Sequence, residues 1–493
     1  MNTNRILSAI LLAAMTLTSA ACSSASDNPT ETSAEETSES NQNADSQDSE
    51  ISDDLPDRNY NGTTFTILDR TKYMYEFSVT EENGDLLNDA TYKRNIKVEE
   101  RFGIDLTTHT VDCMWGEEAT EFNNMLRASV MSGDGAFDLV AGYAAAIPAL
   151  VADGIFMNWA ELDYIDFTKP WWAEEVANEL TINGKNYMIT GDLSLALWKG
   201  MNCFFFNKRL AEEYKIEDIY SIVKNGEWTF DKLIELTNNV YEDLNGDGIR
   251  SEDDKYGFLC VRNTEIDNMK EAFELHVTEK GEDGFPKLVF NNERTVEIVQ
   301  RLNSYIHDSG FVLLASAEMD ADIGRQKFAQ AFSEGRGLFF ASTLGVSEKL
   351  RSMDDDFGII PYPKYNSVQK DYHSTSLDEF SLFLVPNDVK DSEMTAIITE
   401  ALCAESYKTV VPVFYDTALK TKAARDNDSS EMIDIIRDSL TFDWGYLHSN
   451  AMGGVGHLFV DLIRNNNNNV ASEYQKNAAM FEQKLEEILE IYR

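Results

Sequence analysis

The sequence predicts an α/β fold, on three observations. In the first part of the folded region, apolar strand-like segments alternate with amphipathic helix-like ones. This order favours a largely parallel sheet with helices on its faces. Three more short apolar segments occur late in the chain, at 337–343, 357–363 and 379–386. A hydrophobic content of 43%, with 11% aromatic residues, is enough for sizeable cores.

The first elements can be assigned in order. Residues 63–70 alternate as a strand bounded by Asn61 and Gly62. A helix follows, capped by Asn88 and ended by Gly103. The next three elements are a strand at 104–112, a helix at 121–135 and a buried strand at 137–143.

Further along the chain, residues 185–192 and 201–207 predict strands, the second leading into a helix at Lys208. Trp228 precedes Thr229, a helix N-cap, and is therefore expected to be structural. From Glu393 the sequence is mostly helical, with polar loop residues at 465–469.

A cysteine after an N-terminal apolar segment indicates export. Arg5 precedes an uncharged run from Ile6 to Leu17, and small residues lead to Cys22. This is the layout of a secretory signal, and the run is shorter than the about 20 residues that span a bilayer. It resembles a bacterial lipobox, so we expect residues 1–22 to be a lipoprotein signal peptide and Cys22 to carry the lipid. An ordinary cleaved signal with an incidental cysteine is the alternative.

Residues 23–57 predict a disordered acidic tether. They contain almost no apolar side chains, and no Lys or Arg occurs between Ser23 and Leu55. Such a segment cannot bury enough surface to offset its ordering entropy, and its like charges extend it.

Charge and cysteine content exclude several classes of protein. The formal net charge is −44, whereas a nucleic-acid-binding surface needs a basic patch. The same charge disfavours strongly anionic ligands and suits an exported, soluble protein. The other cysteines lie far apart with no CxxC pair, so buried free thiols are expected and disulfides remain open. They are Cys113, Cys203, Cys260 and Cys403.

Five stretches, taken in order, resemble the extracellular solute-binding lipoproteins of bacterial ABC importers, in the carbohydrate-binding group that includes maltose-binding protein. They are FDLVAGY (137–143), GKNYMITGDLSLALWKGMNCFFFNKRLAEEY (184–214), NGEWTFDKLIELTNNVYEDLNGDGIRSEDDKYGF (225–258), FAQAFSEGRGLFFASTLG (328–345) and FGIIPYPKYNSVQKDYHSTSLDEFSLFLVP (357–386).

The resemblance implies a two-lobed, periplasmic-binding-protein-like fold of type II, with the ligand clamped between the lobes. It places the crossings of the chain between lobes near Asp192, Leu338 and Asp378. The expected N-terminal lobe then contains residues 58–193 and 338–378, and the expected C-terminal lobe contains residues 194–337 and 379–493.

The resemblance also implies a function. A lipid-anchored, monomeric receptor at the extracellular face of the membrane would capture a sugar or oligosaccharide and deliver it to an ABC transporter permease. Such a receptor has no enzymatic activity and needs no cofactor.

Residues 243–254, DLNGDGIRSEDD, match the calcium-loop pattern D-x-[DN]-x-[DN]-G-x5-E except for the final residue. Hard oxygens on alternate residues are the ligands that Ca²⁺ prefers. A solvated acidic turn is the alternative, because Asn-Gly and Asp-Gly form turns without metal. The expected ligands of a structural Ca²⁺ are Asp243, Asn245, Asp247, the Ile249 carbonyl, Ser251 through water, and Asp254.

Aromatic residues are candidates for sugar binding, because a sugar presents an apolar ring face that stacks on them. Tyr143 ends a buried strand at its carboxyl end, where open α/β sheets bind ligands. Trp198 follows the first expected crossing and would border the cleft. Trp172 and Trp444 are further candidates, and each of these residues could instead belong to the core.

Charged residues at equivalent places are the candidate polar partners. Asp69 and Arg70 end the first predicted strand, and Asp378 and Glu379 stand beside the last expected crossing. Their charge-assisted hydrogen bonds to sugar hydroxyls would be strong in a closed cleft. For the last two, a cap at a loop edge is the alternative.

The sequence carries no recognisable catalytic motif. GxSxG, HExxH, Walker A and GxGxxG patterns are absent, and the six histidines are scattered. A glycosidase needs two paired carboxylates, but among 86 acidic residues such pairs arise by chance. If Asp378 and Glu379 begin a strand, their side chains face opposite sides. We expect no enzyme; a secreted glycan-active enzyme and a surface glycan-binding adhesin without a transport role are the alternatives.

Overall fold

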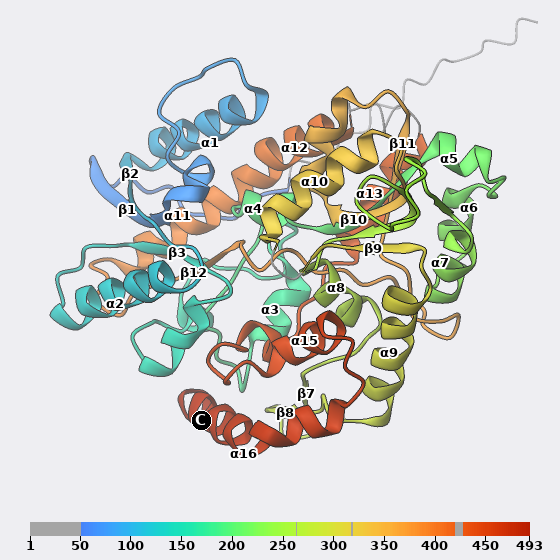
Figure 1. Ribbon diagram of the computed structural model, residues 1–493. Coiled ribbons are helices and arrows are strands. Elements are labelled where there is room, and N and C mark those ends of the chain that lie inside the picture. Colours follow the sequence, from blue (N-terminus) through green and yellow to red (C-terminus); the bar gives the residue numbers. More distant parts are fainter. Residues whose placement is uncertain (1–50, 263, 317–318, 420–426) are drawn as a thin grey trace, which may run out of the picture. The chain divides into compact units, whose positions relative to one another are not determined.

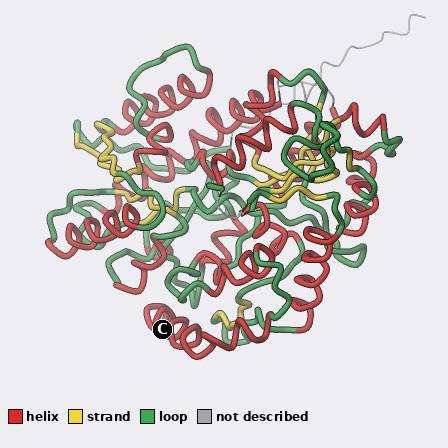
Figure 2. Tube along the Cα trace, in the orientation of Figure 1, coloured by secondary structure: helices red, strands yellow, loops and turns green. Residues whose placement is uncertain are grey.

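Two larger sheets, seen as two groups of strands in Figure 2, organise the chain. The computed structural model describes residues 51–262, 264–316, 319–419 and 427–493. The expected signal peptide with Cys22, and the tether up to residue 50, lie outside the described residues.

The first sheet has the strand order β12-β3-β1-β2. Strand β1 pairs in parallel with β2 and β3, and β12 pairs antiparallel with β3. The predicted strands at 63–70, 104–112 and 137–143 are confirmed, the first residue for residue. The strands are β1 (Thr63–Arg70), β2 (Ile104–Val111), β3 (Leu139–Tyr143) and β12 (Ser381–Leu384).

Helices α1 (Leu86–Phe102) and α11 (Ser392–Glu405) pack together and share an apolar core with β1 (Figure 1). The predicted helix end at Gly103 is confirmed, with φ 61° in the left-handed region. The predicted cap at Asn88 is wrong. Asp85 caps the helix by accepting hydrogen bonds from the backbone N–H groups of Leu87 and Asn88, so α1 begins one turn earlier.

The second sheet has the order β11-β4-β10-β6-β5, and β9 also pairs with β6. Strand β10 is antiparallel to β4 and parallel to β6. The predicted strands at 201–207, 337–343 and 357–363 are confirmed as β4, β10 and β11. The strands are β4 (Asn202–Asn207), β5 (Tyr241–Glu242), β6 (Lys255–Cys260), β9 (Val312–Leu314), β10 (Gly337–Thr343) and β11 (Phe357–Ile360).

An aromatic cluster fills the core beneath the second sheet. The ring of Phe204 stacks on Phe258 at 5.1 Å between centroids and meets Tyr362 edge-on at 4.7 Å. Trp228 is fully buried beside them and donates its indole N–H to the carbonyl of Pro361 at 2.8 Å. Its predicted structural role is confirmed.

The strand order of the two sheets contradicts part of the expected division of the chain into lobes. Residues 338–378, expected in the N-terminal lobe, include β10 and β11 of the second sheet, and Leu338 lies inside β10. Residues after 379, expected in the C-terminal lobe, begin with β12 of the first sheet. Asp192 and Asp378 do lie in segments that join strands of different sheets. The error arises because short apolar strands look alike whichever sheet they join.

Residues 185–192, expected to be a strand, form only single bridges. Ile189 pairs with Phe383, and Gly191 pairs with Trp172. The segment leads into the crossing to β4 rather than extending a sheet, and its residues after Lys185 are all buried.

The remaining helices surround the two sheets (Figure 1). No helix of the described part of the chain is long and apolar enough to cross a membrane. The other regular elements are α2 (Glu117–Ser132), α3 (Glu174–Leu180), α4 (Leu195–Lys199), α5 (Lys208–Glu213), α6 (Ile219–Lys224), α7 (Phe230–Thr237), α8 (Thr264–Ala272), α9 (Glu293–Asn303), α10 (Ala321–Ser333), α12 (Val411–Leu419), α13 (Asn427–Asp438), α14 (Trp444–Leu447), α15 (Leu458–Arg464), α16 (Val470–Leu489), the 3₁₀ helix η1 (Thr71–Glu76), and a hairpin of β7 (Thr278–Lys280) and β8 (Pro286–Leu288).

The last residues of the expected tether are attached to the folded body. Asp54 pairs with Lys169 at 2.6 Å, Asp53 pairs with Arg101, and Leu55 packs against the core of the first sheet. The expected tether boundary at residue 57 is therefore too late, because these acidic side chains form ion pairs with the lobe built around the first sheet. We call this the first lobe, and the lobe around the second sheet the second lobe.

Replacing Glu400 with leucine should lower the free energy of unfolding by about 2–4 kcal/mol. The buried indole N–H groups of Trp171 and Trp172 donate to its two carboxylate oxygens at 2.7 and 2.9 Å, and each unpaired buried donor costs about 1–3 kcal/mol. Denaturant unfolding measures the change. The control Glu393→Gln, on the same helix but half exposed, should change stability by less than about 0.5 kcal/mol. Equal losses in the two variants would contradict this assignment.

Candidate ligand-binding cleft

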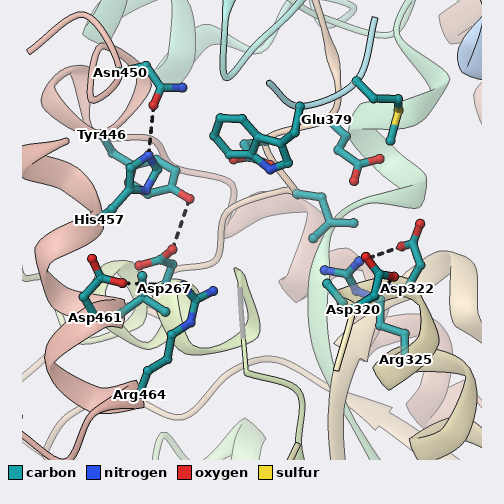
Figure 3. A pocket seen from close by; sticks show the side chains of 16 residues that line it. Asp267, Asp320, Asp322, Arg325, Glu379, Tyr446, Asn450, His457, Asp461 and Arg464 are labelled. Carbon is teal, nitrogen blue, oxygen red and sulfur yellow. Dashed lines mark hydrogen bonds and ion pairs between the residues drawn. The ribbon is translucent and has the colours of Figure 1, made fainter. Parts of the chain in front are cut away.

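A cavity of about 430 Å³ is lined by residues of both lobes and by Leu377, Asp378 and Glu379 (Figure 3). These three residues belong to the segment that joins β11 to β12, which we call the crossing segment. A second cavity of about 390 Å³ adjoins it, because Asp322, Arg325, Leu377 and Glu379 line both. We call the two together the cleft. The end formed by the first cavity is the acidic end, and the end formed by the second is the basic end, after the side chains that line them.

The first lobe contributes the segments that follow the carboxyl ends of β1 and β2. These parallel strands end at the same edge of the sheet, which is where open α/β sheets bind ligands. The η1 residues Tyr73 and Tyr75 line the basic end. Trp115, after β2, lines the acidic end with 52% of its surface exposed. Its ring meets Tyr143 edge-on at 6.0 Å and His457 at 6.1 Å.

The crossing segment forms the wall between the lobes. Leu377 donates its backbone N–H to the carbonyl of Gly200 at 2.9 Å, and this hydrogen bond joins two of the segments that run between the lobes. Glu379 accepts hydrogen bonds from Tyr73 and, at 2.7 Å, from Lys72. Asp378 is 7% exposed. Burial, together with the negative charge of Glu379, raises its pKa to about 7.

Asp267 on α8 is the most deeply buried carboxylate of the acidic end. It is 4% exposed, and its Oδ2 accepts a hydrogen bond from the Tyr446 hydroxyl at 3.4 Å (Figure 3). Its Oδ1 has no hydrogen-bond partner among the described residues. Burial raises the pKa of Asp267 to about 8.

Both arginines of the acidic end already have carboxylate partners. Arg325 on α10 donates to Glu265 at 2.6 Å and to Asp322 at 3.0 Å. Arg464 on α15 pairs with Asp461 at 3.6 Å and donates to a backbone carbonyl at 2.7 Å. The positive charges of both arginines are therefore largely compensated by carboxylates of the protein itself.

The structure brings together two of the expected ligand-binding residues in the cleft, Asp378 and Glu379. Both precede β12, which begins at Ser381, and both line the same cavity. The condition under which their side chains would face opposite sides, that they begin a strand, does not apply, because neither residue belongs to the strand.

Three expected residues lie buried directly behind the cleft wall. Asp69 and Arg70 are fully buried and Tyr143 is 2% exposed. The Arg70 guanidinium lies 4.1 Å from the Tyr73 ring centre and donates to the Ser381 hydroxyl at 3.0 Å. Burial raises the pKa of Asp69 to about 7. These residues position the lining side chains and do not line the cavities themselves.

The three expected tryptophans belong to the core instead. Trp172 is bound to Glu400, and Trp198 packs under Arg437, whose guanidinium carbon lies 5.3 Å from the ring centre. Trp444 is fully buried and stacks on His448 at 3.8 Å. Hydrophobic sequence context does not separate a buried tryptophan from one at a cleft.

Sequence reasoning missed most of the lining residues. Trp115 lies shortly after the predicted strand at 104–112, so the reasoning from strand ends that selected Tyr143 could have identified it. Asp267, Tyr446 and Arg464 come from three separate helices and carry no local signal, because only the folding of distant segments brings them to one cavity.

The loop expected to bind calcium is a series of turns. Asp243 accepts hydrogen bonds from the backbone N–H groups of Gly246 and Gly248 at 2.7 and 2.8 Å. Asp254 is 1% exposed; its Oδ2 accepts from Ser251, and its Oδ1 has no partner among the described residues. In the described part of the chain, no three His, Cys, Asp or Glu side chains are arranged to hold a metal ion.

No protein-family model matches the chain, and no curated protein matches it. Solved structures of similar fold include a cyclo/maltodextrin-binding protein complexed with maltotetraose (14% identity, 87% of this chain and 96% of that chain, TM-score 0.54). Others are the maltose/maltodextrin-binding domain MalE from Bdellovibrio bacteriovorus bound to maltotriose (15%, 85% and 99%, TM-score 0.52) and UspC from M. tuberculosis (12%, 85% and 99%, TM-score 0.55). The fold is that of two-lobed type II solute-binding proteins.

The stability of the Asp267→Asn variant should depend on pH differently from that of the unchanged protein. Because burial raises the pKa of Asp267 from 3.8 to about 8, the folded state keeps a proton that the unfolded state releases. The resulting loss of stability is absent below about pH 4 and develops fully as pH rises to about 8. Asparagine cannot ionise, so the variant should gain at least about 1 kcal/mol relative to the unchanged protein between pH 5 and pH 8.5.

Denaturant unfolding at the two pH values measures this gain. Asp231→Asn, at a side chain that is 67% exposed, is the control and should show no comparable change between pH 5 and pH 8.5. Parallel stability curves for Asp267→Asn and the unchanged protein would contradict the prediction.

Proposed function

We propose that this protein is an extracellular solute-binding protein that captures a sugar or oligosaccharide and delivers it to an ABC transporter permease. The observation that carries this proposal is the cleft, which is lined jointly by the first lobe, the second lobe and the segment crossing between them. A ligand in it touches all three at once.

Lobe closure is the proposed mechanism of capture. Contacts that bridge the lobes at the cleft include Lys72, 3.6 Å from Asp322, Asn450, which donates to the carbonyl of Ala145 at 2.5 Å, and the Trp115 ring, 6.1 Å from that of His457. A ligand that interacts with both sides only in the closed form shifts the equilibrium toward that form. The closed form is then the one that the permease recognises.

A carbohydrate ligand is supported by the mixture of side chains in the cleft. Trp115 and Tyr446 offer ring faces or edges, and carboxylates such as Asp378 and Glu379 accept hydrogen bonds from hydroxyl groups. Two proteins of similar fold were solved with maltotetraose and maltotriose, although their low identity shows the fold alone.

Export and anchoring complete the proposal. A lipid on Cys22 would hold the protein at the outer face of the membrane, and the acidic segment after it would let the lobes reach both solution and permease. One acyl chain binds a membrane only marginally, so stable anchoring requires several chains. An uptake assay separates this receptor from a glycan-binding adhesin, and incubation with glycans separates it from a glycan-active enzyme, which would cleave them.

A structural Ca²⁺ in the loop 243–254 is also proposed. The spacing of its oxygen-bearing side chains and the unpartnered Oδ1 of buried Asp254 support it. To bind the ion, the carboxylates of Asp243 and Asp247 would give up the hydrogen bonds that they accept from backbone N–H groups and coordinate the ion instead.

Thermal unfolding against mono- and oligosaccharides tests the ligand proposal, with protein from Ser23 onward, which lacks only the signal and the lipid. A sugar at a hundredfold excess over its dissociation constant should stabilise the protein by about 2.7 kcal/mol. Trp115→Ala should weaken that sugar's binding at least tenfold, about 1.4 kcal/mol. Met131→Ala, an exposed apolar residue of the same lobe, is the control. Shifts with peptides but with no sugar would keep the fold and overturn the carbohydrate proposal.

Calcium should raise the unfolding temperature of the same protein, and Asp243→Asn should abolish that rise. Asp253→Asn is a matched control, because Asp253 lies in the same loop, is 78% exposed and stands at no ligand position. A loop that never takes the ion would give equal unfolding temperatures in Ca²⁺ and in EDTA.

A further inference from the structure

We propose that the acidic end of the cleft binds a positively charged amino group, so that the captured ligand is an amine-bearing sugar or oligosaccharide. This inference rests on the proposed function, which names only a sugar. It concerns which chemical group the first cavity selects.

The charges that line the first cavity are unbalanced. Two arginines, Arg325 and Arg464, face six carboxylates, and both arginines are engaged by carboxylates of the protein. Lysines line only the second cavity, where Lys72 and Lys199 form ion pairs. The six carboxylates are those of Asp267, Asp320, Asp322, Asp378, Glu379 and Asp461.

Two of these carboxylates are buried without a cation in contact. Asp267 is 4% exposed and Asp378 is 7% exposed, and neither forms an ion pair within the residues that the structure describes. The Oδ1 of Asp267 also lacks any hydrogen-bond partner there. Burial raises the pKa of both groups, to about 8 and about 7, although the charges of Lys270 and Arg464 act on Asp267, and that of Arg325 on Asp378, in the opposite sense.

Near neutral pH Asp267 therefore keeps its proton in the free protein, and a neutral hydroxyl would leave it in that state. An ammonium group offers both an opposite charge and several N–H donors, so its binding favours the ionised carboxylate, whose proton is released to solvent. An ammonium between Asp267 and Asp378 would meet both requirements.

Aromatic rings beside the carboxylates suit the same ligand. Trp115, 52% exposed, lines the first cavity, and its ring centre lies 6.1 Å from that of His457. Tyr446 and His457 line the same cavity from the second lobe (Figure 3). An indole face attracts a cation and also packs against a sugar ring. The cavity therefore combines the two features that an amino sugar presents.

Isothermal titration at pH 7.0 in EDTA, with protein from Ser23 onward, tests the inference. The probes are glucosamine oligomers of two to four units, their N-acetylated forms of equal length, and glucose oligomers. The amine-bearing form should bind at least tenfold more tightly than the N-acetylated form, and added NaCl should reduce this ratio.

Asp267→Asn should reduce the ratio at least fivefold, and Asp378→Asn provides a second variant in case the first fails to fold. Asp231→Asn, at a side chain of α7 that is 67% exposed, is the control. Equal binding of amine-bearing and neutral oligomers would overturn the inference and leave the sugar-binding function standing. Absence of binding by every oligomer would overturn both.

Discussion

The buried carboxylate of Glu76 holds together the three segments on which the cleft depends. It is 1% exposed and accepts hydrogen bonds from the Ser194 hydroxyl at 3.1 Å, the Ala196 backbone N–H at 2.7 Å and the Ser381 hydroxyl at 2.7 Å. These partners lie before or in α4 and at the start of β12, while Glu76 itself ends η1. Since η1, α4 and the residues before β12 all line the cleft, one side chain fixes their relative positions.

The interiors of the lobes differ from the cleft in the kind of contact that holds them together. Each sheet is buried in an apolar core, so each lobe resists deformation. Across the cleft one of the bridging contacts is a partly exposed ion pair: the Lys72 and Asp322 side chains are 37% and 58% exposed, and such pairs stabilise little. Breaking such a pair costs little, which is compatible with the proposed closure of the lobes on a ligand.

The strands were predictable because their signals are local. Residues 63–70 and 337–343 appear as β1 and β10 with their predicted bounds, since apolar runs flanked by glycine or polar turns define both their type and their ends. The membership of each sheet was not predictable. A short buried strand has the same sequence pattern in either sheet. Only the path of the chain between residues 361 and 380 places β12 in the first sheet, whereas β11 lies in the second.

The sequence by itself determined the α/β class, most strands and the polar residues beside the last crossing. Tertiary structure alone decided which side chains form the cleft. Trp172 and Trp444 could lie either in a core or at a cleft, and both lie in a core. Asp267 has the sequence context of an ordinary helix carboxylate, yet it lines the first cavity. The physical reason is that burial and charge compensation depend on neighbours far apart in the chain, and neither is encoded in the residues immediately around a side chain.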